Sequence, residues 1–108
     1  MDLFRKLKKD GFLIESKKIS QIYDLKPFIY LGSSQGMYQE DYYFYHDKLS
    51  VVRVYGCADL KRKMSGIQVG TQIRIGYMGL VNNSHKVFIL KIDEQKNLKE
   101  LLMEDLCS

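Results

Sequence analysis

The sequence predicts a mainly β fold, a five-stranded closed barrel with a short helix before it and an amphipathic helix after it. Runs of β-branched and aromatic residues recur between positions 28 and 92. The 108 residues are enough for one hydrophobic core and one domain. Glycines lie in or at the ends of the predicted strands, where a small barrel needs sharp bends: Gly32, Gly56, Gly70, Gly76 and Gly79.

Residues 1–26 are predicted to form an N-terminal helical extension. The first nine residues place their apolar side chains on one helical face and their lysines on the other, and Gly11 ends this helix. The pattern from 12 to 22 is mixed and fits a strand or a helical turn equally well. Pro27 marks the start of the barrel, because its fixed φ and missing N–H suit the entrance of a strand.

The barrel itself is assigned to residues 28–92. A short helical link is predicted at 59–66, where Leu60 and Met64 are four positions apart. The stretches 46–48 and 79–84 are typical of hairpin turns. Five strand-like runs lie between these elements: 28–31, 42–45, 49–55, 72–77 and 86–92.

Residues 95–106 are predicted to form an acidic amphipathic helix. Four leucines fall on one face of it. The last sixteen residues hold two lysines and five carboxylates, so their net charge is −3. The first 92 residues have a net charge of +7, which gives the whole chain +4. This helix either packs on the barrel and caps its core or recruits a protein partner.

A strand, a hairpin, a helical link and a second hairpin, in this order, are the layout of an OB-like barrel. Three stretches of the chain resemble small phage-type single-stranded-DNA-binding OB-fold proteins: VVRVYG at 51–56, IQVGTQIRIGYMG at 67–79 and HKVFILKI at 85–92. The resemblance implies an OB architecture and binding of single-stranded DNA. The chain departs from the pattern at 80–84, where the hairpin lacks a glycine after Gly79, and the first 25 residues have no counterpart.

Binding of a single strand needs exposed flat rings for the bases and cations for the phosphates. Strand alternation turns Arg53 and Tyr55 outward if Val52 and Val54 face the core. Phe44 has no polar group and belongs inside, so its neighbours Tyr43 and Tyr45 are predicted to be exposed. The predicted nucleic-acid-binding residues are Tyr43, Tyr45 and Tyr55 for stacking, and Arg53, Lys61, Arg62, Lys63, Arg74 and Lys86 for phosphates.

An ordinary structural role for the same residues stays open, because tyrosines often cover the rim of a core and charged side chains are usually just solvated. The sequence contains no motif for catalysis, for a metal or for another cofactor, so a non-enzymatic protein is predicted. His46 and His85 each stand without a second ligand at metal-binding spacing. Glu40 and Asp41 are adjacent, and in a strand they point to opposite faces and cannot act on one bond.

The charge and the apolar runs also bear on partners. The longest apolar runs have four residues and no secretory signal is present, which predicts a cytoplasmic protein without a membrane segment. The modest net charge and the acidic C-terminus favour a second hypothesis, a small phage-encoded protein-interaction module that inhibits a host enzyme. Self-association through oppositely charged regions stays open.

Overall fold

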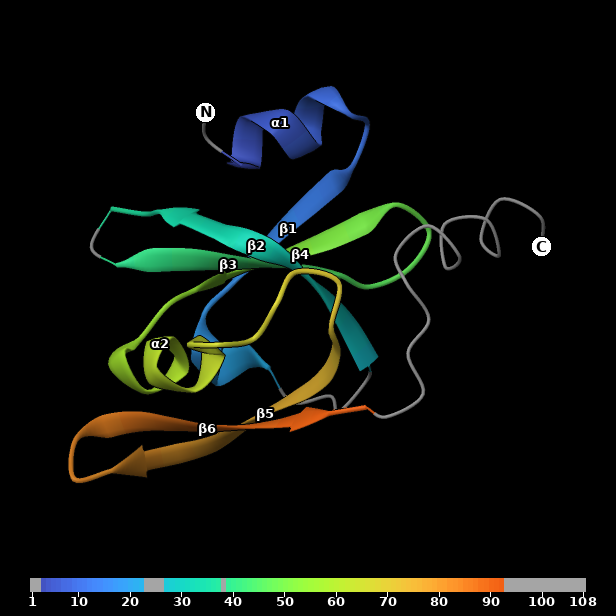
Figure 1. The fold of residues 1–108 in the computed structure, drawn as a ribbon. Helices are drawn as coiled ribbons and strands as arrows, with labels where there is room; N and C mark the ends of the chain where they lie inside the picture. Colours follow the sequence, from blue (N-terminus) through green and yellow to red (C-terminus); the bar gives the residue numbers. More distant parts are fainter. Residues whose placement is uncertain (1–2, 23–26, 38, 93–108) are drawn as a thin grey trace.

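The computed structural model describes residues 3–22, 27–37 and 39–92 (Figure 1). The helices are α1 (Leu3–Lys9) and α2 (Ala58–Met64), and a 3-10 turn, η1, covers Ile19–Gln21. The strands are β1 (Leu13–Lys17), β2 (Pro27–Gln35), β3 (Glu40–Tyr45), β4 (Ser50–Tyr55), β5 (Gln72–Val81) and β6 (Ser84–Lys91). The mainly β class, the first helix and the helical link are therefore confirmed, and the helix predicted at 95–106 lies outside the described residues.

The six strands form one mixed sheet in the order β1-β4-β3-β2-β5-β6 (Figure 1). Strands β2, β3 and β4 make an antiparallel meander, and β5 pairs antiparallel with both β2 and β6. Strand β1 runs parallel to β4, from Leu13 opposite Ser50 to Lys17 opposite Val54. The N-terminal extension thus contributes a strand as well as a helix, and the prediction of a closed five-stranded barrel is wrong, because the described sheet is open.

The sheet stays open because both strands that would close the barrel have other partners. Closure requires β6 to pair with β4, but β1 occupies that edge of β4. On β6 the Val87 N–H donates to the Asp59 carboxylate (3.0 Å), and the Val87 carbonyl accepts from the Lys63 ammonium. Two side chains of α2 therefore satisfy the backbone groups that a neighbouring strand would otherwise use.

Both faces of the sheet are covered, because α1 lies on one side and α2 on the other, between the meander and the β5–β6 hairpin (Figure 1). The main core lies on the α2 side and includes Phe44, Val54 and Leu60, each at most 1% exposed. The second core lies under α1, where Leu7 packs with Tyr43 and Val51. Burial of one such side chain stabilises the fold by about 1.5–3 kcal/mol. No helix in the described ranges is both long and apolar enough to cross a membrane.

Two hairpin turns contain left-handed residues other than glycine. Asn82 and Asn83 have φ values of 52° and 63°, as a two-residue turn with both central residues left-handed requires. In the β3–β4 turn, Lys48 and Leu49 have φ values of 47° and 63°. Leucine is a poor choice for this conformation, which costs a residue with a Cβ about 1–2 kcal/mol.

Replacement of Leu49 by asparagine is therefore expected to stabilise the protein. The Leu49 side chain is exposed, and the backbone bond from the Leu13 N–H to the Leu49 carbonyl (3.0 Å) does not depend on it. Because asparagine adopts the left-handed region more easily, the free energy of unfolding should rise by about 0.5 kcal/mol. Urea denaturation measures this change, and a fall would show that the leucine contributes more by packing than it loses by strain.

Candidate nucleic-acid interface

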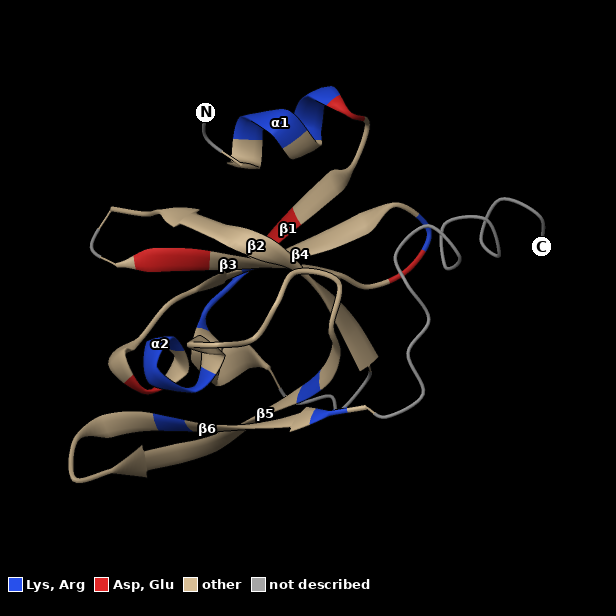
Figure 2. Cartoon of the chain, in the orientation of Figure 1, with Lys and Arg blue, Asp and Glu red and all other residues tan. Residues whose placement is uncertain are grey.

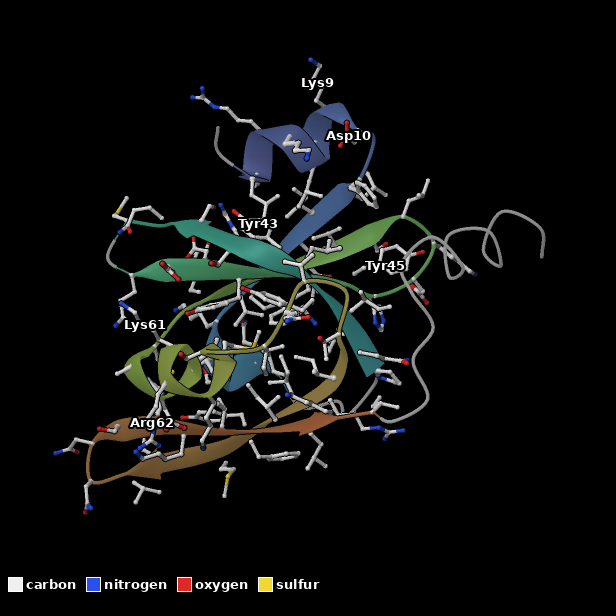
Figure 3. All side chains as sticks on the ribbon, viewed as in Figure 1. Lys9, Asp10, Tyr43, Tyr45, Lys61 and Arg62 are labelled. Atoms are coloured by element: carbon white, nitrogen blue, oxygen red, sulfur yellow. The ribbon has the colours of Figure 1, made fainter. Side chains whose placement is uncertain are left out.

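The two tyrosines of β3 that were predicted to stack bases are buried, so the prediction that they are exposed is wrong. Tyr43 and Tyr45 are each 1% exposed, and Figure 3 marks both on the sheet. Tyr43 packs in the core under α1, where Ser34 Oγ donates to its hydroxyl (3.3 Å). The Tyr45 ring meets Phe12 edge-on at 6.3 Å. The predicted alternation holds, since Phe44 faces the main core, but α1 and the chain after it cover the face that was expected to be open.

Tyr55 and Arg53, from the end of β4, remain at the surface. Tyr55 is 42% exposed. The Arg53 guanidinium carbon lies 5.1 Å from the centre of the Tyr55 ring and 4.7 Å from that of Phe4, so it lies between two aromatic rings. Arg53 also donates to Ser16 Oγ (2.8 Å) and to the Tyr55 hydroxyl (3.1 Å). The arginine thus holds an exposed ring in place at the end of β4.

The positive charge of Arg53 is secure. Partial burial lowers its pKa, but hydrogen bonds with the hydroxyls of Tyr43 and Tyr55 outweigh this, and the pKa is raised overall. A guanidinium held over aromatic faces gains about 0.5–1 kcal/mol from each contact at exposed sites. Arg53 is therefore both a support for Tyr55 and a permanent cation beside it.

A groove of about 430 Å³ opens next to the Tyr55 ring. Met37, 86% exposed, lies at the tip of the β2–β3 turn, which the Gly36 N–H closes by donating to the Gln39 carbonyl (2.8 Å). This hollow, called the Tyr55 groove below, is lined by Lys18, Met37, Gln39, Asp41, Tyr55 and Gly56. It combines a flat ring, a flexible apolar side chain, a cation and a carboxylate.

Helix α1 adds a basic surface that the sequence analysis did not assign to binding. Its lysine and arginine positions make the ribbon of α1 largely blue in Figure 2. Lys8 also lies over the Phe4 ring, with its Nζ 5.3 Å from the ring centre. Because the Phe4 ring also contacts Arg53, the helix and the end of β4 form one surface. The exposed cations of α1 are Arg5, Lys6, Lys8 and Lys9.

Three of the predicted phosphate-binding cations gather around one buried carboxylate instead. The Asp59 side chain is 2% exposed and forms ion pairs with Arg62 (2.5 Å), Lys63 (2.9 Å) and Lys86 (3.9 Å). The hydrogen bond from Lys63 and that from the Val87 N–H hold the pKa of Asp59 well below its usual range, although burial opposes them. These cations therefore have a structural role that the sequence analysis did not foresee.

The two remaining predicted residues, Lys61 and Arg74, are exposed but lie apart. Lys61 belongs to α2, where Figure 3 labels it with Arg62. Arg74 is on β5, opposite Leu90 of β6 and three strand positions from β4. Of the predicted set, the structure joins Arg53 to the exposed Tyr55 and to the buried Tyr43, and it adds Phe4, Lys18 and Met37 to the surroundings of Arg53 and Tyr55.

Comparison with protein-family models, with curated proteins and with solved structures found no match to this chain. The described residues contain no group of three or more His, Cys, Asp or Glu side chains that could hold a metal ion. The role of the surface around Tyr55 is accordingly inferred from its own geometry.

Proposed function

We propose that the protein binds single-stranded nucleic acid, with a base stacked on Tyr55. The observation that carries this proposal is the exposed Tyr55 ring, supported by Arg53 at 5.1 Å and bordered by an open groove of about 430 Å³. A base stacked on an aromatic side chain contributes about 1–3 kcal/mol to binding. The groove offers room for that base, and Met37 offers a second apolar surface beside it.

The charge distribution supports the same function. The phosphates on either side of a stacked base would lie near Arg53 and Lys18, and the basic face of α1 continues the surface. Cations that neutralise phosphates release bound counterions, so affinity should fall as salt rises. DNA is the preferred ligand because of the resemblance described above. The strand order also agrees with an OB-like sheet, since the β2–β3–β4 meander is followed by α2 and then by the β5–β6 hairpin.

The decisive test is fluorescence anisotropy of a labelled thymidine oligonucleotide of about thirty bases, titrated with the full chain at two salt concentrations and against a duplex competitor. Binding at micromolar concentration or below is expected, with preference for the single strand and weaker binding at higher salt. Absence of binding at low salt would overturn the proposal.

A second candidate is a protein-interaction module, and one specific observation favours it. The β5–β6 hairpin exposes several large apolar side chains: Met78, Leu80, Val81 and Leu90. Met78, Leu80 and Val81 lie at the turn end of β5, and contiguous exposed apolar surface marks protein contacts. A pull-down from nuclease-treated bacterial lysate distinguishes the two functions, because only an interaction module should retain a stoichiometric protein partner.

A further inference from the structure

A second hollow lies on the other face of β3 from the Tyr55 groove. Its volume is about 190 Å³, and it opens between β2, β3 and α2. Glu40 and Asp41 are consecutive residues of β3 and line different hollows, Glu40 this one and Asp41 the groove, as the sequence analysis expected of adjacent strand residues. The hollow is called the Glu40 pocket, and its lining includes Tyr30, Ser33, Glu40, Tyr42, Lys61 and Met64.

Hydroxyl groups hold the Glu40 carboxylate in place. Ser33 Oγ and the Tyr42 hydroxyl both donate to Glu40 Oε2, at 3.3 and 3.4 Å. Burial and the nearby carboxylate raise the pKa of Tyr42 to about 12, and burial also raises the pKa of Tyr30. Both phenols are therefore protonated at neutral pH. Because an ionised carboxylate accepts about four hydrogen bonds, Glu40 has acceptor capacity left for a ligand.

Lys61 gives the pocket a second recognition element. It lines the hollow from α2. A cationic ligand would be attracted by Glu40 but repelled by Lys61. A ligand with neighbouring N–H donors and a separate negative charge suits both groups, since the donors match the carboxylate and the negative charge matches the ammonium.

Guanine in a nucleotide has this combination. Its N1–H and N2–H₂ groups lie side by side on one edge and can donate to the two oxygens of one carboxylate, while its phosphate is available to a lysine. Adenine and cytosine each have a donor beside an acceptor on the same edge, and thymine offers a single donor between two acceptors. Of the common bases, guanine therefore fits Glu40 best.

The pocket and the Tyr55 groove are neighbours, because consecutive residues of β3 line them. Gly56 lines the groove, and a Cβ built on it would lie 2.1 Å from the Glu40 carbonyl oxygen and 3.2 Å from the Tyr42 ring. Gly56 therefore packs closely against the backbone of β3 at Glu40, the residue that lines the pocket. We propose that the Glu40 pocket recognises a guanine in the strand that stacks another base on Tyr55, an inference that rests on the proposed function.

The test compares thymidine oligonucleotides that carry one central guanine, adenine or cytosine, titrated with the full chain. The guanine oligonucleotide should bind about tenfold more tightly than the others. Glu40→Gln should remove this preference, because glutamine replaces one acceptor by a donor. The affinity for the oligonucleotide that contains only thymidine should not change. Glu15→Gln, on an exposed position of β1, is the matched control and should keep the preference.

Each outcome separates the two proposals. Equal affinity for all oligonucleotides, or a guanine preference that survives in Glu40→Gln, would overturn the Glu40 pocket as the guanine site and leave single-strand binding intact. Absence of binding to every oligonucleotide would overturn both. Titration of the unmodified protein with GMP and with AMP, followed by NMR, provides a measurement that needs no variant: shifts at Ser33 and Glu40 with GMP alone are expected, and equal shifts with both nucleotides would contradict the assignment.

Discussion

Replacement of Asp59 by asparagine is expected to lower the free energy of unfolding by about 3 kcal/mol. This is the lower end of the loss that follows when one partner of a buried ion pair is removed. Asparagine can still accept the Val87 N–H, but it leaves Lys63 without its carboxylate close to the core. The same change loosens the edge of β6 from α2. Urea denaturation followed by circular dichroism measures the loss.

Asp10 provides the matched control for this experiment. It lies at the exposed end of α1, and Asp10→Asn should change the free energy of unfolding by no more than about 0.5 kcal/mol. An equally small change for Asp59→Asn would show that the Asp59 ion pairs are solvated and do not hold α2 against β6.

Stability should also depend on pH through Asp59. Its pKa is held well below the usual value in the folded protein, mainly by the Lys63 hydrogen bond, whereas in the unfolded chain it is about 3.9. The unfolded state therefore binds the proton first, so the stabilisation is complete above the unfolded pKa and is lost as the pH falls below it towards the folded value. The difference in unfolding free energy between the parent and Asp59→Asn should shrink below about pH 4. A difference that stays constant from pH 7 to pH 3 would contradict the assignment.

The role of Asp59 shows where sequence reasoning reached its limit. The spacing of Leu60 and Met64 correctly predicted a short helix, because that pattern is local. The structure adds that both side chains lie in the main core. The ion pair of Asp59 with Lys86 and its hydrogen bond from the Val87 N–H join residues almost thirty positions apart in the sequence. No local pattern shows which carboxylate a surface lysine will contact. The basic run at 61–63 was therefore interpreted as a phosphate-binding site, although Arg62 and Lys63 form ion pairs that stabilise the fold.

The prediction of buried and exposed strand faces met the same limit of local sequence patterns. Alternation placed Phe44 and Val54 towards the main core, and the structure confirms this. Which opposite face remains open was decided by α1, which packs its Leu7 against Tyr43 and Val51 from a segment more than thirty residues away. The mixed pattern at 12–22 likewise could not show that β1 would take the edge of β4 and keep the sheet open. Tyr55 kept its predicted exposure, beside the open groove at the end of β4.

Replacement of Tyr55 by alanine is expected to weaken single-strand binding by about tenfold, the loss of one stacked base at about 1–2 kcal/mol. Tyr55→Phe keeps the ring and should bind almost as well as the parent, because stacking depends on the π-face and not on the hydroxyl. Anisotropy titration of the same thymidine oligonucleotide measures both variants, and the slope of affinity against salt should be unchanged in both, since no cation is removed.

Tyr77→Ala is the control for loss of a tyrosine elsewhere on the sheet. Tyr77 lies on β5, where its hydroxyl meets His85 Nδ1 at 2.7 Å, away from the Tyr55 groove. The Tyr77→Ala variant should bind the thymidine oligonucleotide with unchanged affinity. If Tyr55→Ala binds as tightly as the parent, or if Tyr77→Ala weakens binding to the same extent, the base does not stack on Tyr55. Binding that is then still sensitive to salt would assign the interaction to the cations of α1, because they make phosphate contacts that need no aromatic ring.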